Sequence, residues 1–69
     1  MATYTTREIN NQKKLVLKRK KNALDLIEDG KQYLAAGAYA GARVRMVDAL
    51  NWIKQAEDAD ARLALMKPE

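Results

Sequence analysis

Two clusters of carboxylates are the side chains best suited to acid–base catalysis or to binding a hard metal ion. Their members are Asp25, Glu28 and Asp29 in the first cluster and Glu57, Asp58 and Asp60 in the second. The sequence of 69 residues contains no His and no Cys, and it has no P-loop or other glycine-rich phosphate-binding motif. Because the carboxylates have no nucleophile or further metal ligand beside them, we expect solvated helix faces. The sequence therefore predicts no enzyme, no catalytic residue, no cofactor and no metal site.

A basic run in the first half of the sequence is the second candidate for chemistry. Six basic residues fall close together: Lys13, Lys14, Lys18, Arg19, Lys20 and Lys21. Such a run could bind nucleic acid or phosphate, could bind an acidic protein surface, or could only keep a helix solvated. On a helix these charges would surround the axis, and no aromatic residue interleaves them as in proteins that bind single strands. We therefore favour the solvated face, followed by an acidic partner and then by nucleic acid.

A third group of residues has the composition of a protein interface. Tyr39, Arg43 and Arg45 follow closely on Gly37, where we expect a turn, and Trp52 is the only Trp of the sequence. Aromatic residues and Arg are enriched in protein–protein interfaces. These four residues are therefore the predicted partner-binding residues. The alternative is that Tyr39 only packs the end of the hairpin and that Trp52 is a partly buried packing residue.

The first element that must position these residues is a long helix. Ala, Leu, Lys, Arg, Glu and Gln dominate the composition, which favours helix throughout. Thr5 and Glu8 form a Thr-x-x-Glu capping box, so we place the helix start at Thr5 or Thr6. Gly37 is the expected left-handed residue just beyond its end. The first helix is therefore predicted over residues of about 5–36.

The second element is a helix predicted over residues of about 38–66, after a turn near residue 37. Pro68 is the only Pro and lies just beyond the predicted end. The expected fold is all-α, a two-helix antiparallel hairpin in a single domain of residues 1–69. No apolar run approaches the roughly 18 residues that a membrane span needs, and the first residues lack the pattern of a signal peptide. We therefore expect a cytoplasmic protein that does not bind membranes.

Apolar spacing predicts which faces of the two helices meet. In the first helix the inward positions are Ile9, Val16, Ala23 and Gly30, widened by Leu24, Ile27 and Leu34. In the second helix the spacing of three and four gives a heptad seam of Tyr39, Ala42, Met46, Ala49, Ile53, Ala56, Asp60 and Leu63. A glycine inside the first helix, Gly30, is explained by close approach of the second helix.

A further apolar set lies off the predicted seam of the second helix. Its members are Val44, Val47, Leu50 and Trp52. A two-helix hairpin buries only one stripe of each helix, and a core in a chain of this size rarely supplies more than about 3–5 kcal/mol. The set therefore predicts another interface, with either a second copy of the chain or a foreign partner. We expect a homodimer that forms a helical bundle.

The middle of the sequence resembles a single tetratricopeptide repeat. Gly30, Tyr33, Ala42 and Ala49 match positions of that pattern between residues 26 and 49. Leu26 replaces its Trp, Asp29 replaces its Leu, and Lys54 replaces the closing Pro. At least three repeats are normally needed for stability, and only one fits. The resemblance therefore indicates local hairpin geometry of this kind and does not establish membership of the family.

The whole sequence resembles a family of small early proteins of Pseudomonas phages, the quorum-sensing anti-activators. The resemblance rests on the length, the Thr-Tyr-Thr-Thr-Arg-Glu opening, the Lys-Arg-Lys-Lys run and the Ala-Gly-Ala-Tyr-Ala-Gly turn. It implies a helical homodimer that takes part in host takeover. It also implies binding to the DNA-binding domain of a LuxR-type transcriptional activator, and a second target in the ATPase that drives type IV pilus assembly. A nucleic-acid-binding protein and a purely structural oligomerisation module are the alternatives.

Overall fold

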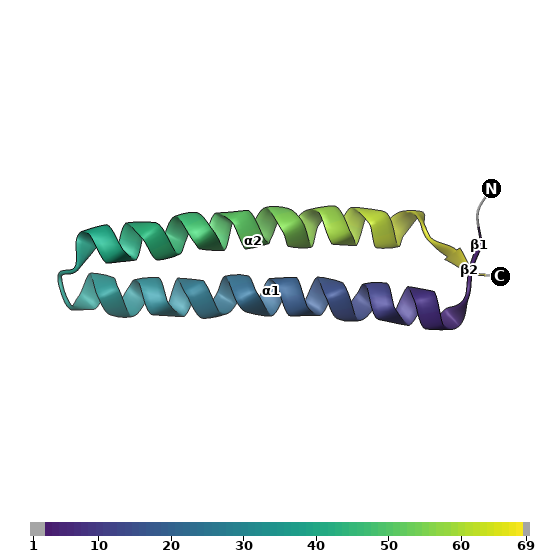
Figure 1. Ribbon diagram of the computed structural model, residues 1–69, viewed down its shortest axis with the longest axis horizontal. Helices are drawn as coiled ribbons and strands as arrows, with labels where there is room; N and C mark the ends of the chain where they lie inside the picture. Colours follow the sequence, from purple (N-terminus) through teal and green to yellow (C-terminus); the bar gives the residue numbers. More distant parts are fainter. Residues whose placement is uncertain (1–2, 69) are drawn as a thin grey trace.

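Two long helices form an antiparallel hairpin in the computed structural model, which describes residues 3–68 (Figure 1). Helix α1 spans Thr6–Ala35 and helix α2 spans Tyr39–Leu65. The predicted all-α hairpin is therefore confirmed, and both helices lie within one or two residues of their predicted bounds. The predicted domain of residues 1–69 extends at each end beyond the described residues.

A short strand pair, which the sequence did not predict, joins the two ends of the hairpin. Strand β1 spans Thr3–Tyr4 and strand β2 spans Lys67–Pro68. The strands pair in parallel, with Thr3 opposite Lys67 and Tyr4 opposite Pro68. Pro68 is tolerated here because a two-residue pair has free edges that require no donor from it. Figure 1 shows both ends of the described chain beside each other, at the end of the hairpin opposite the turn.

The start of α1 is held by the predicted capping box. The Glu8 backbone N–H donates to Thr5 Oγ1 at 3.1 Å, and the Thr5 backbone N–H donates to Glu8 Oε1 at 3.2 Å. These two bonds satisfy backbone donors that a helix start leaves without partners. Thr5 is consequently the N-cap, and the helix begins at Thr6.

The reversal between the helices is a Schellman turn centred on Gly37. Gly37 has a φ of 78°, in the left-handed region that glycine adopts without steric cost. Its N–H donates to the Leu34 carbonyl at 3.0 Å, and the Ala38 N–H donates to the Tyr33 carbonyl at 2.9 Å. The predicted turn at Gly37 is confirmed. Helix α2 starts two residues later at Tyr39, without a side-chain cap from Ala38.

Small residues form the centre of the contact between α1 and α2. The buried residues of the described chain are Ala23, Gly30, Ala42, Ala49 and Ala59. A Cβ atom at Gly30 would lie 2.7 Å from Met46 Cε, so the close approach predicted for this glycine is confirmed. Among residues 3–68 no large side chain is fully buried. The Cα atoms extend over 52 × 16 × 10 Å, so the fold is one helix thick and has no room for a larger core.

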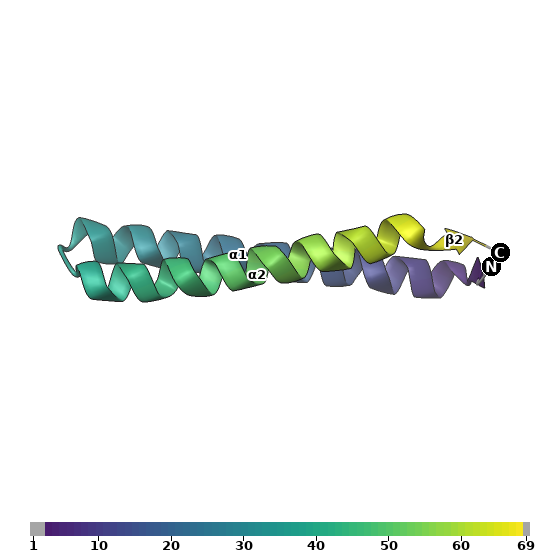
Figure 2. The ribbon, with the colours of Figure 1, turned by 90° about the horizontal axis from the view of Figure 1, so that it is seen from above.

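The inward face of α2 differs from the predicted seam at three of its eight positions. Trp52 and Ala59 face α1, whereas Ile53 is 44% exposed and Asp60 is exposed. Tyr39, predicted to be inward, is also exposed. Spacings of three and of four residues both return to the same side of a helix, so the sequence pattern allowed either choice. Figure 2 shows that α2 crosses α1 at a shallow angle, so the contact face shifts gradually along the helices.

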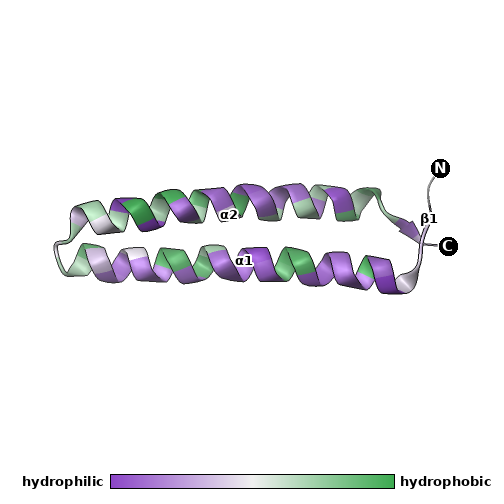
Figure 3. Cartoon of the chain, viewed as in Figure 1, coloured by the Kyte–Doolittle hydropathy of each residue, from purple (hydrophilic) through white to green (hydrophobic). Residues whose placement is uncertain are grey.

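The inward face of α1 is more polar than the sequence suggested. Leu24 and Leu34, predicted to widen the apolar stripe, are exposed. Gln12 and Arg19 lie closer to α2 instead: Gln12 Nε2 donates to the Ala59 carbonyl at 2.9 Å, and Arg19 Nη1 donates to a backbone carbonyl of α2 at 3.0 Å. Large apolar side chains therefore remain exposed on both α1 and α2. Figure 3 shows hydrophobic and hydrophilic residues alternating along both helices. Neither of the described helices is apolar over a stretch long enough to cross a bilayer.

Candidate partner-binding surface

An apolar hollow at the turn end of the hairpin joins residues from both helices. It has a volume of about 380 Å³ and is lined by Leu34, Tyr39, Ala42, Arg43 and Met46. Tyr39 is 70% exposed, so its ring is available to another molecule. The predicted alternative, in which Tyr39 packs the end of the hairpin, therefore does not describe its environment.

The Schellman turn is what brings these side chains together. Leu34 lies in the last turn of α1 and Tyr39 is the first residue of α2, so the reversal at Gly37 places them at the same end of the hairpin. Arg43 follows Tyr39 by four residues and therefore shares its side of α2. The arrangement combines an exposed aromatic ring, an aliphatic floor and a guanidinium group. This is the composition of an interface anchor.

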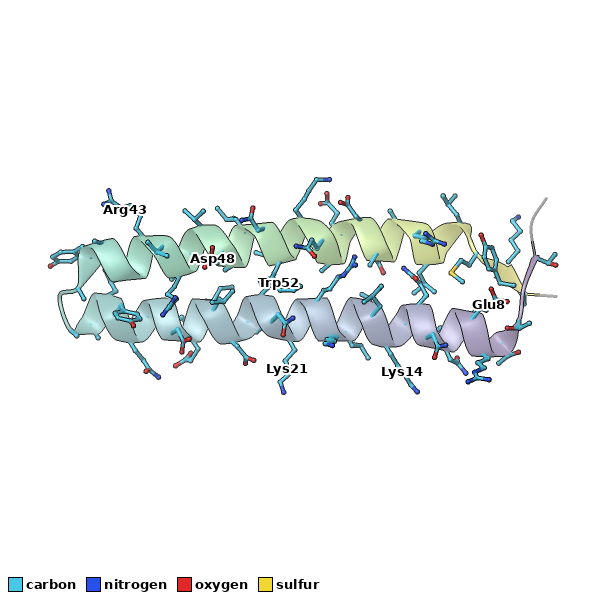
Figure 4. The ribbon with its side chains drawn as sticks, in the orientation of Figure 1. Glu8, Lys14, Lys21, Arg43, Asp48 and Trp52 are labelled. Carbon is cyan, nitrogen blue, oxygen red and sulfur yellow. The ribbon has the colours of Figure 1, made fainter. Side chains whose placement is uncertain are left out.

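A second hollow lies on the neighbouring side of α2. It has a volume of about 330 Å³ and is lined by Ala40, Arg43, Val44, Val47 and Asp48. Arg43 lines both hollows, and Figure 4 shows its side chain directed away from α1. Val44 and Val47 are exposed, as are Leu50 and Ile53 farther along the helix. We call Leu34, Tyr39, Arg43, Val44 and Val47 the tip surface.

Arg45 does not belong to the tip surface, although the sequence grouped it with Arg43. Residues two apart on a helix point in nearly opposite directions. Arg45 Cζ lies 5.4 Å from the centroid of the Tyr33 ring, within the range of a cation–π interaction. Its Nε is shielded from solvent and has no hydrogen-bond partner among the described residues. Asp29 and Gln32 line a separate hollow with Arg45 and Tyr33, of about 340 Å³.

Trp52 also lies apart from Tyr39 and Arg43. Its side chain is half-buried and is seen between the two helices in Figure 4. It lines a hollow of about 220 Å³ with Leu15, Lys18, Arg19, Asn22 and Gln55. The predicted seam left Trp52 outside the contact between the helices, and this was wrong, whereas the interpretation of Trp52 as a partly buried packing residue agrees with its environment. Of the four predicted partner-binding residues, the structure therefore brings together only Tyr39 and Arg43.

The basic run divides into outward and inward residues. All five lysines of the run are exposed, whereas Arg19 reaches α2 and donates to the Gln55 carbonyl. Lys14 and Lys21 point away from α2 in Figure 4. With 3.6 residues per helical turn, the five lysines fall on the outer half of α1, and only Arg19 lies toward α2. The predicted distribution of charge around the whole helix therefore depends on Arg19 alone.

The carboxylate clusters lie on solvated helix faces, as predicted from the lack of a nucleophile or further metal ligand beside them. All six of their side chains are exposed. Lys54 Nζ lies 2.7 Å from Asp58 Oδ1 and 4.0 Å from Glu57 Oε1. The hydrogen bond to Asp58, followed by the charges of Asp58 and Glu57, raises the pKa of Lys54 above its usual value. Within residues 3–68 no group of carboxylates has the arrangement of a metal site.

Three residues of the tip surface were not predicted to belong to one site. They are Leu34, Val44 and Val47. Leu34 was expected to face α2, and the two valines were expected to contact an unspecified partner. The available signal was the short distance along the sequence between Leu34 and Tyr39 across a tight turn. Recognising it required the direction of each side chain at the turn, which the Schellman geometry fixes.

Comparison with known proteins does not add to this description. No protein-family model, no curated protein and no solved structure matches the chain.

Proposed function

We propose that the protein is a phage-encoded inhibitor that binds a host LuxR-type quorum-sensing activator and blocks its DNA binding. The observation that carries this proposal is the tip surface, where an exposed Tyr39 and Arg43 flank apolar hollows. The class of target comes from the resemblance of the sequence to the anti-activators of Pseudomonas phages. The same resemblance makes the type IV pilus assembly ATPase a second proposed target and the host cytoplasm the proposed location.

The inhibitor acts as a homodimer in this proposal. Among residues 3–68 the buried residues are four alanines and one glycine, and large apolar side chains remain exposed on both helices. Such a thin fold gains stability when a second copy covers part of that surface. The remaining apolar surface, at the tip, is then available to the activator. A dimer of two hairpins is a four-helix bundle.

A DNA mobility-shift assay with a purified LuxR-type activator tests the inhibition. The wild-type protein is expected to abolish the activator–DNA complex, and Tyr39→Ala and Arg43→Ala are expected to weaken inhibition by at least about thirtyfold, as the loss of a binding hot spot does. Because both side chains are exposed, the variants are expected to keep their stability within about 0.5 kcal/mol. Leu65→Ala is the matched control, since Leu65 is exposed on α2 far from the turn.

Two outcomes contradict the proposal. If Tyr39→Ala and Arg43→Ala inhibit as well as the Leu65→Ala control, the tip surface does not bind the activator. If the protein shifts the DNA in the absence of activator, nucleic-acid binding by the lysines is the better explanation. Sedimentation equilibrium measures the proposed dimer independently, with an expected mass twice the 7.8 kDa of one chain. A defined dimer that leaves the activator–DNA complex intact would favour the structural module.

A further inference from the structure

A repeated pattern of two lysines followed by a leucine runs along the outer side of α1. Lys13 and Lys14 precede Leu17 by four and three residues, and Lys20 and Lys21 precede Leu24 in the same way. Residues that are three, four or seven apart share one side of a helix. The two units are seven residues apart, or about 10.5 Å along the axis. We call these six residues the Lys–Leu stripe.

The Lys–Leu stripe is exposed along its length. Leu17 is 63% exposed and Leu24 is 56% exposed, and all four lysines are exposed. Arg19, which lies between the two units in the sequence, is not part of the stripe because it bonds to α2. The stripe therefore presents two separate apolar side chains, each bordered by two ammonium groups.

The charge of the stripe is not compensated within the described chain. Among residues 3–68 the ion pairs within 4.0 Å are those of Lys54 with Glu57 and with Asp58, both on α2. None of the four stripe lysines has a carboxylate of the described residues within that distance. A partner that supplies carboxylates beside apolar side chains would complement both features of the stripe at once.

We propose that the Lys–Leu stripe binds an acidic amphipathic helix of a partner protein. The partner helix would carry apolar residues seven apart, to contact Leu17 and Leu24, with Glu or Asp beside them to contact the lysines. A helix that binds in this way contacts its partner through apolar side chains at regular helical spacing. This surface is separate from the tip surface, and the inference does not depend on the proposed inhibition of an activator.

The other occupants fit the stripe less well. Nucleic acid would meet the lysines but would leave the leucines against charged phosphates, and the one arginine of the run is turned inward. An anionic membrane would receive only two leucines, whereas interfacial helices present a long apolar face. A second copy that docked through the same stripe about a two-fold axis would bring lysines against lysines, which is unfavourable.

A designed peptide tests the proposal with the full-length protein. The probe is a fluorescein-labelled helical peptide with Leu every seven residues and Glu three and four positions from each Leu. Fluorescence anisotropy is expected to detect binding that weakens as salt is added. The double variants Leu17→Ala/Leu24→Ala and Lys20→Gln/Lys21→Gln are each expected to weaken binding at least about tenfold. Leu65→Ala and Arg62→Gln on α2 are the matched controls and are expected to bind normally.

Several results would overturn the proposal. They are an absence of binding at peptide concentrations up to about 1 mM, equal binding of a peptide with Gln in place of every Glu, and equal binding by both double variants. Retention on phosphatidylglycerol vesicles or duplex DNA without peptide binding would assign the stripe to those partners instead. A lower sedimentation mass for Leu17→Ala/Leu24→Ala would assign the leucines to contact with a second copy. Circular dichroism verifies that each variant remains folded.

Discussion

Replacing Gly37 with alanine is expected to destabilise the hairpin by about 1 kcal/mol, and the cost can be worked out from the backbone alone. The φ of 78° lies in the left-handed region, which costs a residue with a Cβ about 1–2 kcal/mol. Among residues 3–68, no atom beyond Gly37 itself and its two chain neighbours lies within 4 Å of a Cβ built at this position, so the new methyl group meets no other part of the hairpin. The substitution also stiffens the unfolded chain, which offsets about 0.4–1 kcal/mol of the cost.

Thermal unfolding followed by circular dichroism measures this effect. For a chain of this size, 1 kcal/mol corresponds to a fall in Tm of about 4–8 °C. Wild type and variant are compared at equal protein concentration, because dimer formation would make the Tm depend on concentration. Gly37→Asn is the matched control. Asn tolerates the left-handed conformation better than Ala, so its Tm is expected to fall by less than half as much.

The Gly37→Ala result also bears on the tip surface. Leu34 and Tyr39 share a hollow only while the Schellman turn holds the ends of α1 and α2 together. If Gly37→Ala melts within about 1 °C of wild type, the left-handed turn is not needed and this explanation of the tip surface is refuted. The same conclusion follows if Gly37→Asn falls as far as Gly37→Ala.

Two further substitutions test the electrostatics of the hairpin. Arg45→Met is expected to raise the free energy of unfolding in urea by about 1 kcal/mol. The unpaired Nε of Arg45 costs about 1–3 kcal/mol, and this exceeds the roughly 0.5–1 kcal/mol that the cation–π contact with Tyr33 contributes. A variant less stable than wild type would contradict this prediction. The hydrogen bond to Asp58 raises the pKa of Lys54 above its usual value of 10.5. The stabilisation of the fold by charged Lys54 is therefore fully present below pH 10.5 and is lost as the pH rises through the raised pKa. Melting of wild type and Lys54→Met should therefore converge in alkaline solution, and a constant difference would contradict the assignment.

The local features of the fold could be predicted from the sequence because each depends on a few neighbouring residues. The capping box needs only Thr5 and Glu8, and the reversal needs a glycine where φ is positive. Both signals arise from backbone donors and acceptors that must find partners near the ends of a helix. For the same reason the bounds of both helices were predicted closely.

The phase of the contact between α1 and α2 could not be predicted in the same way. Trp52 and Ile53 are both apolar, and each lies three or four residues from Ala49 and Ala56. Helical periodicity therefore permits either residue to face α1. The structure places Trp52 there, and its half-buried ring contacts a hollow that Arg19 also lines. Choosing between Trp52 and Ile53 required the position of α1, which neighbouring residues of α2 do not determine.

The close packing of the hairpin separates the residues that build the fold from those left for other molecules. Because Ala23, Gly30 and Ala49 occupy the centre of the contact, the helices approach closely and the larger apolar side chains lie outside. The tip surface and the Lys–Leu stripe both consist of such outward residues. Substitutions there change little of the buried contact, so the hairpin can acquire new partners without losing its fold. A side chain at Gly30 would instead meet the flexible end of Met46, which would have to move to another position in the contact between the helices.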